Sequence, residues 1–376
     1  MRIALVRQRY NPYGGAERFI ERALQALERS GAEVTLIARS WTGGDRRVLR
    51  IDPPYVGSLW RDAGFARAAR AAWTRERFDL VQSHERIAGC DLYRAGDGVH
   101  RQWLDLRLER ISRLERSKIR ANPYHRYVCK TERRMFEHPQ LRAVICNSRM
   151  VRDDVLRHFR VAREKLHVLY NGVDLDHFHP RHRAALREDA RQALGCAAQD
   201  LLFAFVGSGF ERKGLACAID ALAQCRDERL RLAVAGNDRH ASRFAERAAA
   251  AGIADRVRLL GGLDDVRPLY AAADCFILPS LYDPFPNAAL EALAMGVPGI
   301  VSRQCGVAEL LRPGENGWIC EPHDAAGLAA LLATAAGEAR GEGMAAAARA
   351  TAEGLGIDEM AEKLTTLYAT LGARPR

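Results

Sequence analysis

The chain has 376 residues, of which 48% are hydrophobic and 28% charged, a composition that fits an ordinary globular protein with two domains. No apolar run approaches the roughly 18 residues of a membrane-spanning helix, and an expected strand at residues 3–6 begins too early for a secretory signal. The nine cysteines include no C-x-x-C pair, which predicts reduced thiols in a cytoplasmic protein, and the formal net charge is +10.

The first half of the chain alternates short apolar runs with helical segments. The expected strands are residues 3–6, 33–38, 77–83, 90–95, 141–147 and 165–169, and the expected helices are residues 16–30 and 150–159. This alternation is typical of an α/β fold with a parallel, doubly wound sheet. Ligands of such folds bind at the carboxyl ends of the strands, so the residues that follow each strand are candidates for a site.

Three groups of polar or glycine residues follow strands in this half. Gly14-Gly15 precedes the first helix, His84 follows the third strand, and Asp97 and His100 follow the fourth. We expect the carboxyl ends of the third and fourth strands to open onto one crevice. A single histidine near a strand end is more often hydrogen-bonded or solvated than catalytic, and a glycine pair alone is more often a plain tight turn than a binding site.

The positive charge is concentrated in residues 101–134. This segment holds eleven lysines and arginines against four acids, an excess of seven that accounts for most of the net charge. Trp103 and several leucines are interleaved at mixed helical spacing. Such a segment suits an anionic membrane surface, where each basic side chain contributes about 1 kcal/mol. The alternatives are a solvated helix with pairs such as Glu109–Arg113, and nucleic acid, although no nucleic-acid-binding fold accompanies the charge.

Residues 170–180 are irregular and polar, and we interpret them as a linker between two domains. They contain Asp174-x-Asp176, a pair that binds a divalent metal in folds where it ends a core strand. Here the pair follows Asn171-Gly172, so a linker is the stronger interpretation and we expect no metal site.

The second half repeats the alternation and predicts a second domain of the same kind. The expected strands are residues 201–206, 230–235, 256–260, 275–278, 299–302 and 318–320, and the expected helices are residues 215–225, 241–251, 264–272, 287–295, 324–336, 341–352 and 357–371, with a short helix at Glu309. The turn after the first of these strands reads G-x-G-x-x-x-x-G from Gly207. This is neither the dinucleotide fingerprint nor a P-loop, which argues against a dehydrogenase or an ATPase.

The turn at Gly207 and Gly209 presents Arg212 and Lys213. Glycines after a strand let backbone N–H groups approach an anion. A guanidinium and an ammonium placed next to them suit a diphosphate.

A second loop, residues 279–286, lies between a strand and the helix 287–295. Asp283 precedes this helix and Glu291 is one turn inside it, so one carboxylate can face a sugar while the other reaches a ribose. Together the two loops predict a site for a nucleotide diphosphate-sugar. A surface role for Lys213, or a helix-dipole role for Glu291, is the alternative.

With these motifs the chain resembles the retaining GT-B glycosyltransferases of family 4, which include sucrose synthase-like and lipopolysaccharide-core enzymes. Their donor site combines an Arg and a Lys after a Gly-rich turn with a Glu–seven residues–Glu motif. Here those positions are Arg212, Lys213, Asp283 and Glu291, so the first acid is one methylene shorter, which concerns the identity of the sugar more than the reaction class. The resemblance covers nearly the whole chain and is nearest to the glucosyltransferases that act on the inner-core heptose of lipopolysaccharide.

The resemblance implies a role for each matching residue. The implied catalytic residues are Asp97, Arg212, Lys213 and Asp283, the donor-binding residues are Gly14, Gly15, Gly207, Gly209, Asn237, Pro286, Asn287, Ala288 and Glu291, and the acceptor-side residues are Glu17, His84 and His100. The two cations and the helix N-terminus would stabilise the departing diphosphate. We therefore expect neither a metal nor a cofactor.

The implied fold is α/β, of the GT-B type, with two Rossmann-like domains facing across a cleft. Residues 1–170 would bind the acceptor, with the C-terminal helix 357–372 packed back on them, and residues 181–356 would bind the nucleotide sugar. The implied reaction moves glucose from UDP-glucose to a lipopolysaccharide heptose at the cytoplasmic face of the inner membrane. Alternatives are an exopolysaccharide or other lipid-linked acceptor, a nucleotide-sugar epimerase, and a non-enzymatic module that holds a membrane or nucleic acid. For the enzymatic functions we expect no nucleic-acid partner.

Overall fold

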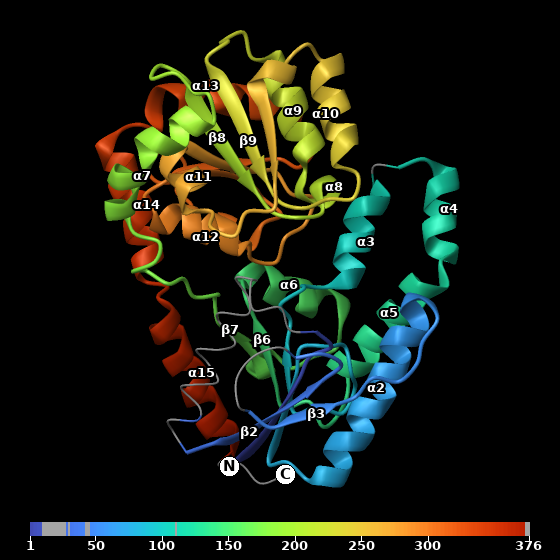
Figure 1. Cartoon of the computed structure of the whole chain (residues 1–376). Helices are drawn as coiled ribbons and strands as arrows, with labels where there is room; N and C mark the ends of the chain where they lie inside the picture. The colour runs from blue at the N-terminus through green and yellow to red at the C-terminus, as the bar shows by residue number, and fades with distance from the viewer. Residues whose placement is uncertain (10–27, 29–30, 42–45, 110, 373–376) are drawn as a thin grey trace. The chain divides into compact units, whose positions relative to one another are not determined.

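The computed structural model describes residues 1–9, 28, 31–41, 46–109 and 111–372. The chain divides into two compact units, which contain Met1–Asn171 with Ile357–Arg376, and Gly172–Gly356. Each unit is a parallel sheet flanked by helices (Figure 1), as the alternating sequence pattern predicted. In the described part of the chain, no helix has both the length and the apolar character needed to cross a bilayer.

The first unit is built on a seven-stranded sheet in the order β3-β2-β1-β4-β5-β6-β7. Its strands are β1 (Arg2–Val6), β2 (Glu33–Ala38), β3 (Val48–Arg50), β4 (Leu80–Ser83), β5 (Leu92–Arg94), β6 (Ala143–Cys146) and β7 (Leu166–Val168). All neighbouring pairs are parallel. The direction of winding reverses between β1 and β4, so the carboxyl ends of these two strands form the position where ligands bind in doubly wound sheets.

Helices cover both faces of this sheet. They are α2 (Gly57–Glu76), α3 (His100–Glu109), α4 (Arg113–Ala121), α5 (Pro123–Phe136), α6 (Arg149–His158), the short helix η1 (Arg163–Lys165) and α15 (Ile357–Gly372). One core contains apolar side chains of α2, α5 and α6. The other is closed by α15, which contributes six buried residues from Ile357 to Leu371.

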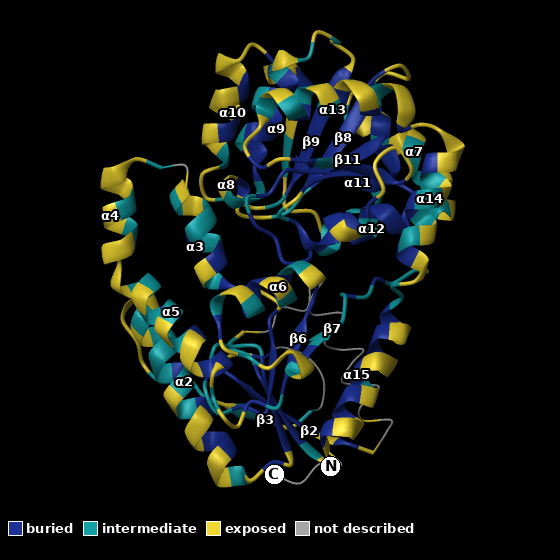
Figure 2. Ribbon diagram, turned by 180° about the vertical axis from the view of Figure 1, so that it is seen from behind, coloured by how far each residue is buried: buried dark blue, intermediate teal, exposed yellow. Residues whose placement is uncertain are grey.

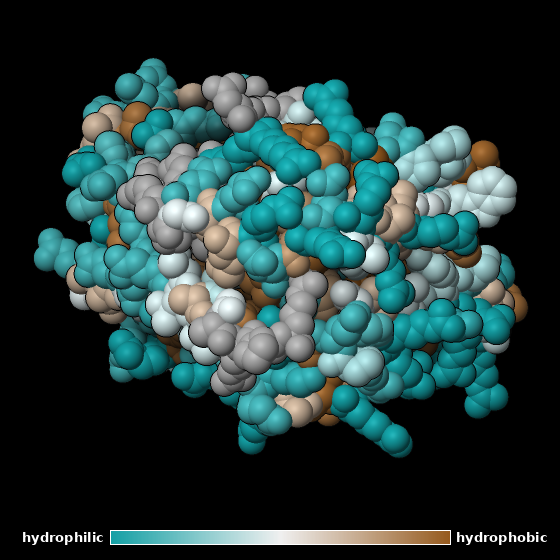
Figure 3. Space-filling model, turned by 90° about the horizontal axis from the view of Figure 1, so that it is seen from below, coloured by the Kyte–Doolittle hydropathy of each residue, from teal (hydrophilic) through white to brown (hydrophobic). Residues whose placement is uncertain are grey.

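Burial follows this layering closely. In Figure 2 the central strands of both sheets are buried, whereas the edge strands β3 and β10 have no buried residue and α4 is entirely exposed or intermediate. The face of the molecule seen in Figure 3 is mostly hydrophilic, with hydrophobic atoms in small separate patches. Parallel strands are buried on both sides, which explains why short continuous apolar runs identified them in the sequence.

The first unit differs from the expectations in several places, and the strand β3 is one that was not predicted. The 20-residue helix α2 was not predicted, and it ends at Arg77, whose left-handed φ of 54° and N–H bond to the Trp73 carbonyl close the helix. The strand expected from residue 77 therefore starts only at Leu80. The basic segment 101–134 forms three helices, which are separated by a capping box at Ser112 and by Pro123 at the start of α5.

The second unit has a six-stranded parallel sheet in the order β10-β9-β8-β11-β12-β13. Its strands are β8 (Leu201–Val206), β9 (Leu230–Ala235), β10 (Val257–Gly261), β11 (Cys275–Leu278), β12 (Gly299–Ser302) and β13 (Gly317–Cys320). Its helices are α7 (Pro180–Ala193), α8 (Phe210–Lys213), α9 (Leu215–Gln224), α10 (Ala241–Ala250), η2 (Ala254–Arg256), α11 (Arg267–Ala272), α12 (Asn287–Ala294), η3 (Gly306–Leu310), α13 (Ala325–Glu338) and α14 (Glu342–Glu353). The winding reverses between β8 and β11.

The helix α7 is attached to the second unit by arginines rather than by an apolar stripe. Arg183, Arg187 and Arg191 follow one another at intervals of four residues and therefore share one face of the helix. Arg183 and Arg187 donate to the carbonyls at the end of α11, between Ala271 and Ala273. Arg187 and Arg191 also form ion pairs with Asp274.

Asp274 is the centre of this ion-pair cluster and is 2% exposed. It also pairs with Arg340 at 3.0 Å and accepts the Leu202 N–H at 2.9 Å. Burial works to raise the pKa of Asp274, but the bonds from Arg340 and Leu202 and the charge of Arg187 hold it below the usual value. The buried carboxylate therefore stays ionised and ties α7, and Arg340 just beyond the end of α13, to the sheet.

The Asp174-x-Asp176 pair lies in a local turn of the second unit. Asp174 Oδ1 accepts the N–H groups of Asp176 at 3.2 Å and His177 at 3.0 Å, while Asp176 faces Arg181 at 3.5 Å. Among the described residues, no group of three or more acids, histidines or cysteines is arranged to hold a metal ion. These contacts fit a turn-forming role for the pair.

Candidate functional site

The candidate site lies where the winding of the second sheet reverses. β8 and β11 are hydrogen-bonded neighbours, with Cys275 opposite Phe203 and Phe276 opposite Ala204. Their carboxyl ends lead into residues 207–214 and 279–286 respectively. The pairing of these two strands therefore brings together two loops that are about seventy residues apart in the sequence.

The first loop contains a one-turn helix that the sequence did not predict. Gly209 (φ 77°) and Gly214 (φ 79°) flank α8 in left-handed conformations, which only glycine adopts readily. A Cβ atom on Gly214 would lie 2.1 Å from the Pro279 carbonyl oxygen, so glycine also permits close contact with the second loop. Arg212 and Lys213 thus project from a fixed helical turn.

Both cations of α8 contact the second loop. Arg212 Nη1 donates to the Tyr282 carbonyl at 3.0 Å and lies 3.7 Å from Asp283 Oδ2. Lys213 Nζ forms an ion pair with Asp283 Oδ2. The Leu281 N–H donates to the Arg212 carbonyl at 2.9 Å, which joins the two backbones. The Arg212 side chain is 41% exposed, whereas those of Lys213 and Asp283 are 11% and 8% exposed.

The backbone on both sides of Asp283 is fixed by the segment that follows β12. The Asp283 N–H donates to the Gln304 carbonyl and the Gly306 N–H donates to the Asp283 carbonyl, both at 2.9 Å. Burial, together with the nearby charge of Asp283, raises the pKa of the Cys305 thiol to about 11. Asp283 is therefore a positioned carboxylate within a preformed loop.

The helix α12 begins directly after this loop. Its N-cap is Pro286, which supplies no side-chain acceptor for the first amides, so the N-terminus of the helix carries its partial positive charge toward the loop. Glu291 lies one turn inside α12, half-buried, and its Oε2 is 3.2 Å from the Tyr270 hydroxyl. Tyr270 also donates to the Ala288 carbonyl at 3.0 Å, which fixes the start of α12.

The turn after β9 completes this edge of the sheet. Gly236 (φ 142°) allows contact with the first loop, because a Cβ there would lie 2.2 Å from the Gly207 carbonyl oxygen. Asn237 is exposed, accepts the Gly262 N–H at 2.9 Å and donates its own N–H to Ser208 Oγ at 3.3 Å. Asp238 accepts the Phe210 N–H at 2.8 Å and so fixes the start of α8.

Sequence reasoning missed the supporting residues Asp238 and Tyr270. Asp238 could have been found, because it follows a predicted strand at the edge where the site forms. Tyr270 gave no such signal, since it acts through contacts with α12. Gly214 was part of the glycine turn read from the sequence, but its close approach to Pro279 was not predicted. The predicted residues of this unit all lie at this one edge, in its loops, in α8 or in the first two turns of α12: Arg212, Lys213, Asp283, Glu291, Gly207, Gly209, Asn237, Pro286, Asn287 and Ala288.

The remaining predicted residues belong to the first unit, and Gly14, Gly15 and Glu17 lie outside the described residues. His84 directly follows β4 at the reversal between β1 and β4, and its N–H donates to the Val6 carbonyl at 3.0 Å. Burial, and then the charges of Arg7 and Arg94, hold the pKa of His84 well below the usual value. This histidine is therefore neutral at physiological pH.

Asp97 and His100 lie in the loop after β5 and at the start of α3. The Asp97 side chain is 79% exposed and is 3.9 Å from Arg86. The His100 N–H donates to the buried Glu132 at 2.8 Å, and its ring nitrogen is 3.2 Å from that of His125. Burial, with the charges of Arg86 and His125, lowers the pKa of His100 to about 3. Asp97 is thus accessible, whereas His100 is engaged in local structure.

Two family models match the chain and between them span most of its length. The model described as "Glycosyl transferases group 1" matches residues 187–346, which include both loops of the candidate site. The model described as "Glycosyltransferase Family 4" matches residues 13–177 of the first unit.

Individual relatives agree with these models. The chain is 26% identical to the lipopolysaccharide glucosyltransferase WaaG of Escherichia coli K12 over 332 residues, 86% of each chain. It is also 26% identical to the D-inositol 3-phosphate glycosyltransferase of Streptomyces avermitilis over 390 aligned positions, which cover 94% of this chain and 82% of the relative.

Solved structures share the fold. A crystal structure of WaaG has a TM-score of 0.84 at 24% identity and covers 97% of this chain and 99% of its own. Anabaena HepE in complex with UDP-glucose has a TM-score of 0.72 at 21% identity, covering 98% of this chain and all of its own. The chain therefore belongs to the group 1 and family 4 glycosyltransferases, and its two Rossmann-like units are those of the GT-B fold.

Proposed function

We propose that this glycosyltransferase moves glucose from UDP-glucose to a heptose of the lipopolysaccharide core, with retention of the anomeric configuration and without a metal ion. The likeness to WaaG supports the sugar and the acceptor, and the UDP-glucose complex of HepE supports the donor. The single observation that carries the proposal is the convergence of Arg212 and Lys213 on Asp283, beside the N-terminus of α12.

This convergence suits a nucleotide diphosphate-sugar because it offers positive and negative groups side by side. The diphosphate would draw Lys213 and the more exposed Arg212, whose charges match phosphate oxygens. Asp283 would then accept hydrogen bonds from sugar hydroxyls. Glu291, on the next helical turn, would accept those of the ribose.

In the reaction, the bond between the anomeric carbon and the phosphate oxygen breaks through an oxocarbenium-like state. Negative charge builds on the departing diphosphate, and fixed donors stabilise it without reorganisation. We assign this role to Arg212, Lys213 and the first amides of α12. The acceptor hydroxyl oxygen would form the new bond to the anomeric carbon while its proton passes to the leaving phosphate, and Asp97 would contact the transferred sugar.

The proposal is tested by replacing Lys213. We expect Lys213→Ala to lower turnover of UDP-glucose by about two to three orders of magnitude, the usual loss when one donor to a developing oxyanion is removed. Glu211→Ala is the matched control, because Glu211 is an exposed residue on the same turn. Unchanged turnover in Lys213→Ala, with normal folding by circular dichroism, would remove the phosphate assignment.

A phosphorylated cyclitol is a second candidate acceptor, favoured by the match to D-inositol 3-phosphate glycosyltransferases. The experiment offers heptose-terminated lipopolysaccharide core and D-inositol 3-phosphate to the enzyme with the same donor. Transfer to the core alone supports the proposal, and transfer to the cyclitol alone contradicts it.

Other acceptors and an epimerase reaction are distinguished by the products. Mass spectrometry of the reaction mixture identifies a glycosylated acceptor, whereas an epimerase releases an isomerised sugar without needing an acceptor. A product that forms equally well without any acceptor would contradict transfer to lipopolysaccharide.

We also propose that the enzyme associates with an anionic membrane through residues 101–134. The helix α4 in this segment has no buried residue, and Leu114 on it is 67% exposed beside exposed Arg113 and Lys118. Vesicles that contain phosphatidylglycerol should sediment the protein at low salt, and Arg113→Gln/Lys118→Gln should weaken this binding. Equal binding to neutral vesicles would contradict an electrostatic attachment.

A further inference from the structure

The first unit contains an arginine-rich pocket that the proposed donor chemistry does not use. It has a volume of about 670 Å³ and lies between α2, the loop after β4 and α5. Its lining includes Arg67, Arg70 and Arg75 from α2, Arg86 from the loop and Arg134 from α5, and none of its described lining residues is an acid. This size is within the range of pockets for small organic ligands.

Most of this positive charge is not neutralised by the protein. Arg86 pairs with the buried Glu132 at 3.1 Å and faces Asp97 at 3.9 Å. The other four arginines make no ion pair with any carboxylate in the described part of the chain. Burial, together with the charge of Arg70, lowers the pKa of the nearby His138. Like charges gathered at one concave surface repel each other, so an anion there would stabilise the arrangement.

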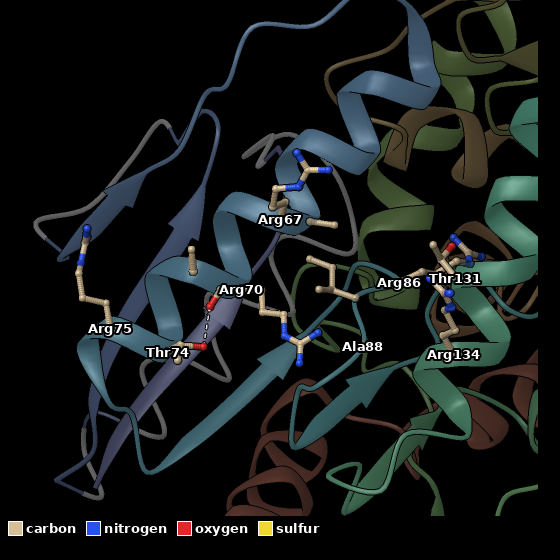
Figure 4. A pocket seen from close by; sticks show the side chains of 11 residues that line it. Arg67, Arg70, Thr74, Arg75, Arg86, Ala88, Thr131 and Arg134 are labelled. Atoms are coloured by element: carbon tan, nitrogen blue, oxygen red, sulfur yellow. Dashed lines mark hydrogen bonds between the residues drawn. The ribbon is translucent and has the colours of Figure 1, made fainter.

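The side chains are arranged to approach one ligand from two sides. In Figure 4, Arg70 extends from α2 into the gap toward Ala88, Arg86 and Arg134 lie on the α5 side, and Arg75 points away. Arg70 also lies against the backbone of Gly89, where a Cβ would be 3.4 Å from its guanidinium carbon. Its direction is therefore constrained.

Apart from Thr74 and Thr131, the rest of the lining is apolar. Ala66, Ala71, Ile87 and Ala88 separate the arginines, so the pocket offers charged groups for an anion and a surface for carbon atoms. Guanidinium groups match the geometry of phosphate oxygens and bind them with paired hydrogen bonds.

We propose that this pocket binds a phosphate ester, with the phosphate held by Arg67, Arg70 and Arg134 and the organic part against the apolar lining. Two sources share this chemistry: the headgroup of an anionic phospholipid and a soluble phosphate ester. The N-terminal end of α2 exposes Val56 to 80% and Trp60 to 63%, and an exposed tryptophan is typical of side chains that enter a membrane interface.

The test compares two double variants of the full chain with the same change of charge. Arg67→Gln/Arg70→Gln removes two cations of the pocket. Arg160→Gln/Arg163→Gln removes two exposed cations of the same unit that lie outside both the pocket and residues 101–134. The probes are sn-glycerol 3-phosphate, measured by titration calorimetry, and phosphatidylglycerol-containing vesicles, measured by sedimentation.

We expect the pocket variant to bind at least one probe about tenfold or more weakly than the unaltered chain, and the control variant to bind both within about twofold, because two charge-assisted contacts are lost only in the first. Loss of glycerol phosphate binding identifies a soluble ester. Loss confined to vesicles identifies a lipid headgroup, and Trp60→Ala should then weaken vesicle binding as well. Equal losses in both double variants, or no binding of either probe by the unaltered chain, would overturn the proposal.

Discussion

Asp283 holds Lys213 in an ion pair, which would have to open to admit the diphosphate of the proposed donor. The two partners are only 8% and 11% exposed, so the pair is shielded from solvent and its exchange for a ligand is a substantial electrostatic change. Under the proposed assignment, binding and transfer would make opposite demands on Asp283. Its charge would compete with the diphosphate for Lys213, while its oxygens would accept hydrogen bonds from the sugar.

We therefore expect Asp283→Asn to separate the two steps. UDP affinity should be unchanged or a few-fold tighter, because Lys213 is released, while kcat falls by about two orders of magnitude. Asp283→Glu, which keeps the charge and adds one methylene, is the control and should retain more activity. Calorimetry with UDP and a donor turnover assay measure the two quantities. Weaker UDP binding in Asp283→Asn would contradict this competition.

The residues of this site were predictable, but their pairing was not. Arg212, Lys213 and Asp283 were identified by residue type in the loops after predicted strands, and Glu291 by its place one turn inside the predicted helix 287–295. The Lys213–Asp283 pair depends on β8 and β11 being neighbours, and that adjacency follows from sheet order, which local sequence does not encode.

His100 contributes to the pH dependence of stability. Its pKa is lowered to about 3 in the native protein, whereas the unfolded chain binds a proton near pH 6.5. The stabilising effect of the neutral ring is therefore complete above about pH 6.5 and is lost as the pH falls toward 3.

We expect the urea concentration at the unfolding midpoint to decrease when the pH is lowered from 7.5 to 5. This decrease should be smaller in His100→Asn. His240→Asn removes an exposed histidine and should show the same fall as the unaltered protein. A His100→Asn midpoint with undiminished pH dependence would contradict this account.

At the level of elements, buried strands were predicted best and the helix α7 was missed. β8, β9, β11 and β12 have the predicted bounds, because a parallel strand reads as a continuous apolar run. The interval 180–193 has no apolar stripe, since Arg191 is its only residue described as buried. Its packing relies on arginines that donate to α11 and to Asp274, a pattern that resembles a solvated segment in the sequence.

This arrangement makes Asp274 a critical residue for the second unit. We expect Asp274→Asn to destabilise the protein by about 3–5 kcal/mol, because it leaves Arg187, Arg191 and Arg340 around an uncharged, buried partner. Asp255→Asn is the control, since that side chain is 76% exposed and 3.5 Å from Arg231, and should cost less than about 1 kcal/mol. Equilibrium unfolding in urea gives both values, and equal effects would refute the role of Asp274.

At the scale of the whole molecule, each unit has its own sheet and core, so we expect two unfolding transitions. Four of the five tryptophans, Trp41, Trp60, Trp73 and Trp103, lie in the first unit. Tryptophan fluorescence therefore follows mainly the first unit, whereas calorimetry follows both.

UDP should shift only the unfolding transition of the second unit, which calorimetry detects and tryptophan fluorescence mainly does not. At a concentration one hundred times its Kd, it should stabilise the second unit by about 2.7 kcal/mol. Lys213→Ala should reduce this shift at the same UDP concentration. If UDP shifted only the transition seen by fluorescence, nucleotide would bind to the first unit, and the proposed site in the second unit would be wrong.

The closing of the first core by α15 has a consequence for how the chain is made. Ile357 to Leu371 cover a sheet whose strands all precede residue 170, so the amino-terminal half leaves the ribosome with one hydrophobic face bare. The segment translated between them carries every strand and helix of its own unit and is able to fold first. The half synthesised first is thus completed last, and a nonsense codon as late as position 354 would leave it without its final layer.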